Sequence, residues 1–282
     1  MKESVDILLG TYRPDPAFFE VQMDSLRAQV GVDAQVLQRE DERGEGAAAN
    51  FSMLLGQSTA DYIAFADQDD MWKEEKLAKS MACMREMERQ YGVHTPLLVF
   101  VDGLVTDVAL KPCPQTIISR QRVDVVKGIA FNRLLMQNFI AGNAMLFNAA
   151  LREKAGPVPS GALMHDSWLA LVAAAFGHIG FVDEPLYFYR QHGANALGAT
   201  TGDARHVARR AREGVGAFRT RLQANVLQAR AFVDRFGSAA PACAWALAHL
   251  PEISFLGRRR AILQNRLFKQ GLLRNLALLA FA

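Results

Sequence analysis

The sequence has few cysteines and no long apolar run, and both features exclude some classes of protein. Its three cysteines, Cys83, Cys113 and Cys243, are far apart and form no Cys-x-x-Cys pair. This spacing argues against a zinc site or a disulfide framework and fits a reducing compartment. No apolar run approaches the roughly 18–20 residues that span a bilayer, and no apolar signal segment follows Met1. We therefore expect a cytoplasmic protein, and leave open a peripheral association with the cytoplasmic face of the inner membrane.

Two nucleotide-binding signatures are missing or misplaced. The sequence has no Gly-Lys-Ser/Thr of the Walker type. Residues 44–49 match the dinucleotide fingerprint G-x-G-x-x-A, but Arg39 to Arg43 separate them from the preceding strand-like run, whereas a true fingerprint follows its strand directly. An NAD-dependent enzyme is therefore disfavoured. A nucleotidyltransferase would need a Gly-rich, basic loop after the first strand, where Arg13 alone is weak support.

Charge is unevenly distributed along the chain. Residues 200–282 hold 14 Lys and Arg against 4 Asp and Glu, whereas residues 1–199 hold 18 against 25. A basic tail on an acidic body predicts that the tail meets an anionic surface. Nucleic acid is disfavoured because no aromatic residues are interleaved with the Arg clusters. Arg258 to Arg274 instead have the pattern of a basic amphipathic helix for a bilayer surface, with packing against the rest of the protein as the alternative.

Strand and helix patterns alternate in the first part of the chain. Apolar runs at 5–9, 34–37 and 62–66 alternate with helical patterns that begin at Pro16 and at Ala47. This order predicts an α/β fold, Rossmann-like, with a mostly parallel sheet and helices on both faces. Further strands are expected at 97–105, 139–147 and 185–190, and further helices at 73–90 and 163–176. Long helical segments after Gly198 predict a helical C-terminal extension over residues 199–282, with a break near residues 237–241.

The most informative segment is residues 62–72, Tyr-Ile-Ala-Phe-Ala-Asp-Gln-Asp-Asp-Met-Trp. A strand-like run ends in Asp67, Asp69 and Asp70, which repel one another, so a positive group is expected among them. Mg²⁺ or Mn²⁺ prefers such oxygen ligands and usually brings a phosphate. A solvated acidic turn is the alternative. Because ligands bind beyond the carboxyl ends of parallel strands, we expect the polar residues after all three strands to converge in one crevice.

Several short motifs follow one another along residues 4–198. They are Val-Asp-Ile-Leu-Leu-Gly-Thr-Tyr (5–12), Ala-Asn-Phe (49–51), Phe-Ala-Asp-Gln-Asp-Asp-Met-Trp (65–72), Gly-Asn-Ala-Met-Leu-Phe (142–147), His-Asp-Ser-Trp-Leu-Ala-Leu (165–171) and Tyr-Arg-Gln-His-Gly (189–193). In this order they resemble the family-2 inverting glycosyltransferases with the A-type nucleotide-sugar fold, particularly the rhamnosyltransferase-like branch. The resemblance makes residues 1–198 the catalytic domain. It implies transfer of rhamnose or another hexose from a dTDP- or UDP-linked donor to a bacterial surface glycan, free or lipid-linked.

The resemblance also implies roles for individual residues. Asp69 would hold Mg²⁺ or Mn²⁺ to neutralise the leaving diphosphate, with His192 as a further metal ligand. Asp166 would take the acceptor proton as general base, although any helix N-terminus can carry such a carboxylate. The expected donor contacts are Thr11, Tyr12, Arg13, Glu40, Asp41, Asn50, Asp67 and Gln68. The expected acceptor contacts are Asp70, Trp72, Gly142, Asn143, His165 and Trp168, with buried packing as the alternative for the two tryptophans.

One segment departs from the family pattern. A helix and a strand usually separate the acidic pair after the second strand from the Asn-Phe motif, but here only residues 42–49 intervene. Roughly twenty residues are missing, so either the sheet lacks a strand or the sequence omits a stretch. Glu40-Asp41 also replaces the two aspartates followed by Gly-Ser that relatives prefer. A second hypothesis therefore stays open: a catalytically degenerate transferase-like scaffold recruited to a membrane glycan-synthesis complex.

Overall fold

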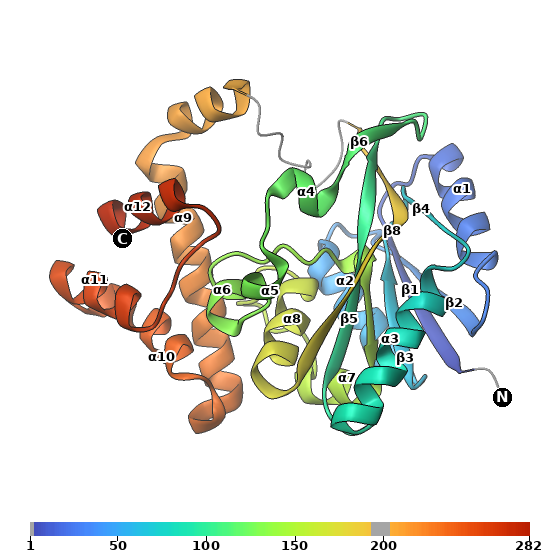
Figure 1. The fold of residues 1–282 in the computed structure, drawn as a ribbon, viewed down its shortest axis with the longest axis horizontal. Coiled ribbons are helices and arrows are strands. Elements are labelled where there is room, and N and C mark those ends of the chain that lie inside the picture. The colour runs from blue at the N-terminus through green and yellow to red at the C-terminus, as the bar shows by residue number, and fades with distance from the viewer. Residues whose placement is uncertain (1–2, 193–203) are drawn as a thin grey trace. The chain divides into compact units, whose positions relative to one another are not determined.

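The computed structural model of the protein describes residues 3–192 and 204–282, which form two compact units (Figure 1). Unit 1 comprises Met1–Gln121, Ile140–Val158 and Met164–Thr200, and unit 2 comprises Arg122–Phe139, Pro159–Leu163 and Thr201–Ala282. The domain boundary expected between residues 198 and 199 lies outside the described residues. Unit 2 also takes in two earlier segments that no sequence pattern had set apart.

Unit 1 is built on one eight-stranded sheet with the strand order β2-β1-β3-β7-β5-β8-β4, and β6 pairs with β5 outside this path. The strands are β1 (Ser4–Thr11), β2 (Asp33–Glu40), β3 (Tyr62–Ala66), β4 (Met71–Trp72), β5 (Leu97–Thr106), β6 (Pro112–Thr116), β7 (Met145–Asn148) and β8 (His178–Arg190). The long pairings, β1 with β2 and β3 and β5 with β8, are parallel. The short strand β7 runs antiparallel between β3 and β5. The sheet is thus mixed, with parallel pairing over most of its paired length.

Helices cover both faces of this sheet, as predicted. The helices of unit 1 are α1 (Pro16–Arg27), α2 (Ala47–Gln57), α3 (Lys76–Tyr91), α4 (Ile117–Gln121), α7 (Ala149–Ala155) and α8 (His165–Phe176). Phe65 of β3 lies 5.1 Å from Phe51 of α2 and 4.7 Å from His165 of α8, between ring centroids. Tyr62 of the same strand donates its hydroxyl hydrogen bond to Glu88 of α3. Residues three apart on a strand point to opposite faces, so α2 and α8 cover one face and α3 covers the other.

The segment after β2 is short because the sheet ends there. Among the described residues β2 pairs only with β1, and residues 41–46 alone connect it to α2. Within the described residues the sheet thus ends at β2, as the first of the two explanations for the departure from the family pattern requires. The continuous apolar run of β1 fits its central position, since Val5, Ile7, Leu8 and Leu9 are completely buried under helices on both faces.

Other stretches of unit 1 differ from the expected elements. β7 begins only at Met145, because residues Gly142–Ala144 form the 3-10 turn η1 where a strand was expected. β8 begins at His178, well before the expected start at Pro185, because its first half pairs with β5. Thr116 ends β6 and residues 117–121 form α4, in a stretch whose sequence favours neither strand nor helix.

Unit 2 is helical, as expected for the C-terminal extension. Its elements are α5 (Val125–Gly128), α6 (Phe131–Leu134), α9 (Ala204–Phe236), η2 (Gly237–Ala239), α10 (Ala242–Ala248), η3 (Leu250–Glu252), α11 (Phe255–Gln264) and α12 (Leu272–Phe281). The predicted break follows α9, and a kink within α9 falls at Gly214, whose φ of 64° is left-handed. Phe232 packs against Phe131 and Phe236 to form part of the core. None of the described helices is both long enough and apolar enough to cross a membrane.

Gly177, which ends α8, is expected to tolerate no side chain. A Cβ atom there would lie 1.7 Å from the backbone oxygen of Pro96, so Gly177→Ala must displace backbone. We expect a loss of about 1–3 kcal/mol or more in the free energy of unfolding, measured by chemical denaturation. Gly56→Ala is the matched control, because no heavy atom lies within 4 Å of the added methyl group and helix propensity favours alanine. Equal stability of the two variants would contradict the packing described at Gly177.

Candidate active site

Three strand ends meet at one edge of the sheet, as the alternation of strands and helices predicts. Thr11 ends β1 in register with Glu40 at the end of β2, and Leu9 of β1 pairs with Ala66, the last residue of β3. Because these strands are adjacent and parallel, the residues that follow them share the carboxyl edge. The backbone of Tyr12 and the side chain of Gln68 join two of these loops. The Tyr12 N–H donates to Gln68 Oε1 at 2.7 Å, and Gln68 Nε2 donates to the Tyr12 carbonyl at 3.2 Å.

Two of the three aspartates after β3 are held in different ways. Asp70 is completely buried and accepts hydrogen bonds from Asn143 Nδ2 and from the backbone N–H of Arg190. Asp69 places Oδ2 2.7 Å from Nε2 of His192, and both side chains are less than one-fifth exposed. The two side chains therefore differ in burial: that of Asp70 lies inside the protein, whereas that of Asp69 is partly accessible to solvent. The cluster is no simple solvated turn.

Two basic side chains accompany the carboxylates, although burial lowers the pKa of one of them, Lys76, well below its ordinary range. The side chain of Lys76, at the start of α3, is buried, and its Nζ lies 3.0 Å from the centroid of the Trp72 ring. The guanidinium of Arg190, at the end of β8, donates from Nε to the carbonyl of Asp69 at 2.8 Å and lies over the ring of Phe18. Sequence reasoning foresaw a positive group but not its identity. Lys76 lies in a run of charged residues that is typical of the exposed face of a helix. Only the structure shows that it is buried beside the aspartates.

The pKa values of the carboxyl groups follow from this crowding. Burial, together with the negative charges of Asp69 and Asp166, raises the pKa of Asp67 to about 7. Burial also raises the pKa of Asp70 well above its ordinary range, and the charges of Asp67 and Asp69 add to the shift. Burial raises the pKa of Asp166 to about 6, against the opposing effect of backbone N–H groups that bind its charged form. Asp166 is thus ionised at neutral pH, and its charge reaches Asp67.

Asp166 and His165 open helix α8 beside the turn η1. The backbone N–H of Gly142 binds the Asp166 carboxylate, and a Cβ on Gly142 would lie 2.9 Å from His165 Nε2. The His165 ring is stacked on Phe51 with centroids 4.1 Å apart, and burial lowers its pKa to about 3. Neither ring nitrogen of His165 has a hydrogen-bond partner among the residues that the structure describes. A glycine at position 142 therefore lets the turn approach both side chains, and His165 remains neutral.

Of the residues expected to contact a nucleoside, some are buried and others are exposed to solvent. Asn50 is buried, donates to the carbonyls of Thr11 and Arg39, and accepts from the Arg39 guanidinium at 2.7 Å. Tyr12 and Arg13 are exposed, and the Arg13 guanidinium lies 5.2 Å from the Tyr12 ring centroid. Asn50 thus fixes the edge between β1 and β2, while Tyr12 and Arg13 offer accessible surface.

Asp41 is occupied by its own loop. Its two carboxylate oxygens accept hydrogen bonds from the backbone N–H groups of Glu45 and Gly46 at 2.9 and 2.8 Å. These bonds, that from Glu45 above all, lower the pKa of Asp41, and the side chain is buried. Glu40 beside it is exposed. In this structure Asp41 therefore shapes the short turn into α2, and Glu40 is the accessible carboxylate at the end of β2.

The two tryptophans expected to stack on sugars lie in the core instead. Trp72 and Trp168 are 1% and 0% exposed, and the indole N–H of Trp168 donates to the Ala155 carbonyl at 3.2 Å. Neither ring has a free face for a sugar, so the packing alternative holds for both in this structure. The sequence was compatible with both stacking on a sugar and packing in the core. The burial of both rings favours packing in the core.

Asp69 and His192 are the residues that could hold a metal ion. Across residues 3–192 and 204–282, no group of three or more His, Cys, Asp and Glu side chains has the arrangement of a metal site. Mg²⁺ and Mn²⁺ are commonly held by one or two protein ligands, with waters and substrate phosphates completing the coordination. A carboxylate and an imidazole in contact, both partly accessible, fit that donor set. Such an ion would be bound together with its phosphate ligand rather than by the protein alone.

Comparison with known proteins supports the fold. No family model matches the sequence, and no curated protein matches it. The mannosyltransferase PcManGT from Pyrobaculum calidifontis, solved with GDP-Man and Mn²⁺, aligns with 99% of this chain and 79% of its own at 16% identity and a TM-score of 0.51. Residues 1–349 of S. aureus TarS, solved with UDP, align with 93% of this chain and 78% of their own at 11% identity and a TM-score of 0.51. The predicted α/β fold of the glycosyltransferase A type is confirmed.

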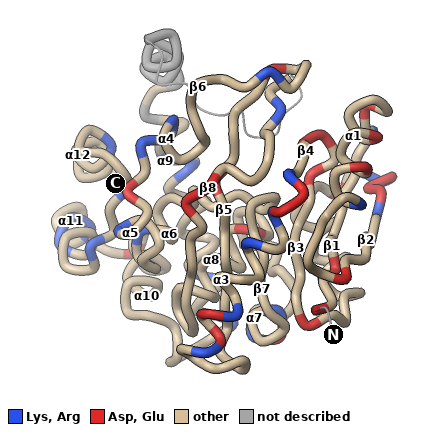
Figure 2. Tube along the Cα trace, turned by 45° about the vertical axis from the view of Figure 1, so that its right-hand side comes forward, with Lys and Arg blue, Asp and Glu red and all other residues tan. Residues whose placement is uncertain are grey.

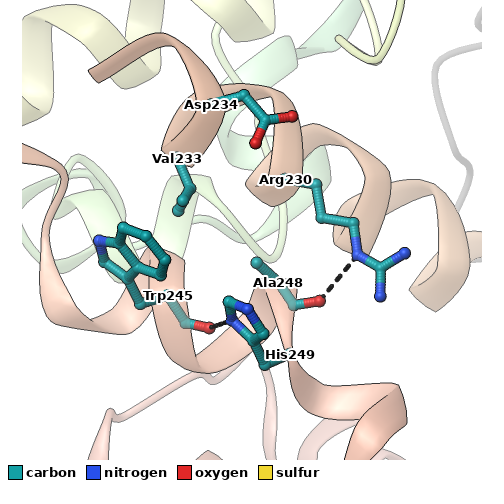
Figure 3. A pocket seen from close by; sticks show the side chains of 6 residues that line it. All are labelled: Arg230, Val233, Asp234, Trp245, Ala248 and His249. Atoms are coloured by element: carbon teal, nitrogen blue, oxygen red, sulfur yellow. Dashed lines mark hydrogen bonds between the residues drawn. The ribbon is translucent and has the colours of Figure 1, made fainter. Parts of the chain in front are cut away.

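A separate pocket of about 290 Å³ lies within unit 2 and is not the site predicted from the sequence (Figure 3). It is lined by Arg230, Val233, Asp234, Trp245, Ala248 and His249. Arg230 donates to the Ala248 carbonyl and to Glu252, and His249 Nδ1 lies 3.0 Å from the Trp245 carbonyl. These contacts hold α10 against α9, so the polar groups of the pocket are largely committed to the structure of unit 2.

Asp67→Asn is expected to stabilise the protein, and to do so most at alkaline pH. The pKa of Asp67 is raised in the folded state, so folding favours the protonated carboxyl group. This contribution to the free energy of unfolding is complete only below the pKa that Asp67 has in the unfolded chain. It is lost as the pH rises through about 7. Asparagine stays neutral throughout. In metal-free buffer we expect the gain in unfolding free energy to exceed about 1 kcal/mol at pH 8 and to be smaller at pH 5, measured by chemical denaturation. Asp61→Asn, at the exposed start of β3, is the control and should show no such pH-dependent gain. A loss of stability in Asp67→Asn at pH 8 would contradict the crowding described here.

Proposed function

We propose that the protein is an inverting, metal-dependent glycosyltransferase that moves a sugar from a nucleoside-diphosphate donor to a hydroxyl of a growing bacterial surface glycan. One observation carries the proposal: Asp69 contacts His192 at the carboxyl edge of the sheet, and the charges of Asp69 and Asp166 both act on Asp67. This edge is where α/β folds of this kind bind nucleotides. The fold is shared with solved glycosyltransferases, one of them bound to GDP-Man and Mn²⁺.

The donor end of the proposed site lies along the loops after β1, β2 and β3. Asp69 and His192 would hold Mg²⁺ or Mn²⁺, which acts when bound as a Lewis acid toward the leaving diphosphate. Tyr12, Arg13 and Glu40 are exposed and available to the nucleoside. Thr11, Asn50 and Gln68 position these loops by the hydrogen bonds described above. Rhamnose on dTDP or UDP is our leading candidate for the donor, on the strength of the sequence motifs.

The acceptor end is assigned to the turn η1 and the start of α8. The acceptor hydroxyl oxygen bonds to the anomeric carbon while the bond from that carbon to the diphosphate breaks, and Asp166 takes the hydroxyl proton. A raised pKa near 6 suits this role, because the group is ionised at pH 7–8 yet basic enough to accept a proton. Gly142 brings the turn η1 into contact with Asp166 and His165, and Asn143 of the same turn is hydrogen-bonded to Asp70. A lipid-linked glycan at the cytoplasmic face of the inner membrane is the acceptor that we favour.

Donor binding is the first test. We expect calorimetric titration to show that UDP, dTDP or GDP, or one of their sugars, binds the full chain in the presence of Mn²⁺ and much more weakly in EDTA. Asp69→Asn should abolish the dependence on Mn²⁺, because it removes a ligand of the metal, while Asp61→Asn should leave binding unchanged. If the intact chain binds none of these nucleotides, the catalytic proposal fails. The alternative, a degenerate scaffold recruited to a membrane complex, would then be preferred.

The base is tested by its pH dependence. Asp166→Asn is expected to lower the rate of sugar transfer by about 10²–10⁴-fold, the usual effect of losing a general base. In the wild type the rate should fall as pH drops through about 6, because protonation removes the base. The readout is sugar transfer or, before the acceptor is known, donor hydrolysis in initial-rate assays. A variant with full activity, or a rate that rises below pH 6, would remove Asp166 from this role.

A further inference from the structure

Helices α11 and α12 of unit 2 expose large apolar side chains. Leu272 and Leu273 at the start of α12 are 75% and 81% exposed, and Leu256 at the start of α11 is 76% exposed. Phe255, Leu263, Leu276 and Phe281 are also exposed. Contiguous surfaces of this kind on a folded protein usually meet a partner or a membrane.

Most of the exposed side chains of α12 lie on one face of the helix, and only Phe281 is exposed well outside it. At about 100° per residue, Leu272, Leu273, Leu276 and Ala280 fall within one narrow arc, and Leu278 falls on the opposite side. All four residues in the arc are exposed, whereas Leu278 is completely buried. The helix is therefore apolar on two sides. One side packs into unit 2, and the other is left unpartnered among the described residues.

Arg259 joins α11 to the end of α12. Its Nη1 donates to the carbonyl of Ala282 at 2.9 Å, and its Nη2 donates to the carbonyl of Ala280 at 3.0 Å. A guanidinium at these last carbonyls is also favoured by the dipole of α12. Lys269 and Asn275 exchange hydrogen bonds of 2.7 and 2.9 Å across the connection between the helices. Hydrogen bonds thus join α11 to the end of α12, and we call the exposed residues of these two helices together the α11–α12 surface.

The charge of this surface has one sign. Residues 253–282 contain Arg258, Arg259, Arg260, Arg266, Lys269 and Arg274 and no Asp or Glu. Figure 2 shows Lys and Arg along α11. Arg260 and Arg266 are exposed beside the apolar side chains. Apolar residues that can enter the acyl boundary, flanked by cations that can meet lipid headgroups, are what an anionic bilayer binds. A second copy of the chain would bring like charges together, so the charge disfavours self-association.

We propose that the α11–α12 surface docks on an anionic lipid bilayer, with α12 lying in the interface. A ten-residue helix is about 15 Å long, half of the roughly 30 Å hydrocarbon core, so it can lie in the membrane surface but not cross it. Leu272, Leu273 and Leu276 enter the acyl boundary, while Arg260 and Arg266 contact the headgroups. The inference goes beyond the proposed function and does not depend on it, because it concerns unit 2 alone.

Vesicle sedimentation tests the proposal with the full chain and without donor or acceptor. We expect the protein to sediment with vesicles of equal phosphatidylcholine and phosphatidylglycerol, and several-fold less with phosphatidylcholine alone or at high salt. The double variant Leu272→Glu/Leu273→Glu should weaken binding at least about tenfold, because two large apolar side chains no longer enter the bilayer. Arg260→Gln/Arg266→Gln should reduce the preference for anionic vesicles. Both pairs are exposed, so thermal unfolding should be unchanged.

Val93→Glu, at an exposed apolar position of unit 1, is the matched control and should bind like the wild type. Failure of the wild type to bind anionic vesicles would overturn the proposal. Equal binding by the Leu272→Glu/Leu273→Glu variant would also overturn it. So would a wild-type dimer in size-exclusion chromatography that the same variant converts to monomer without any vesicle binding, because the surface would then be a protein interface. None of these results depends on nucleotide binding, so the proposed glycosyltransferase activity is judged separately.

Discussion

Unit 1 depends on keeping several carboxylates close together at one edge of its sheet. Asp67, Asp70 and Asp166 all have raised pKa values, chiefly through burial, and the charges of neighbouring carboxylates add to the shifts of Asp67 and Asp70. The fold tolerates this crowding because Lys76 is buried with the cluster and because backbone N–H groups bind the carboxylates of Asp70 and Asp166. Such an arrangement costs stability and is retained where it serves chemistry. Most of the distinctive features of unit 1 can be understood as ways of offsetting this repulsion.

The strand β8 has a central part in that arrangement. It runs parallel to β5 for most of its length and also pairs with β4, so its end lies beside the loop after β3. The backbone and the guanidinium of Arg190 then bind Asp70 and Asp69, and His192 reaches the Asp69 carboxylate two residues later. A strand far from β3 in the chain, β8, thereby completes the acidic cluster. The same geometry leaves Asp69 as the carboxylate with access to a ligand, whereas Asp70 serves as the buried anchor.

Local patterns were enough to predict the strands and helices that carry the site. The apolar runs of β1, β2, β3 and β5 and the convergence of their polar ends follow from the alternation of strand and helix alone. Contacts between elements that are far apart in the sequence could not be predicted from these local patterns. Lys76 looks like any lysine in a charged helix, Trp72 and Trp168 look equally suited to a sugar or a core, and Asp41 gives no sign that its own loop occupies it. In each case the packing of elements far apart in sequence decides the role, as it does for the late start of β7 at η1.

The absent strand beyond β2 has a consequence for nucleotide recognition. Since β2 is the edge and Asp41 is bound to the turn at residues 45–46, the acidic pair offers one accessible carboxylate, Glu40, rather than two. In the proposed site, selectivity for a nucleoside would then come mainly from the loop after β1, where Gln68 fixes the backbone of Tyr12 and leaves its ring and Arg13 exposed. An aromatic ring and a guanidinium recognise a base by stacking and by charge, with little discrimination between pyrimidines and purines. Under the proposed function, the short segment after β2 would therefore change which nucleotides the site distinguishes more than whether the acidic cluster binds a diphosphate.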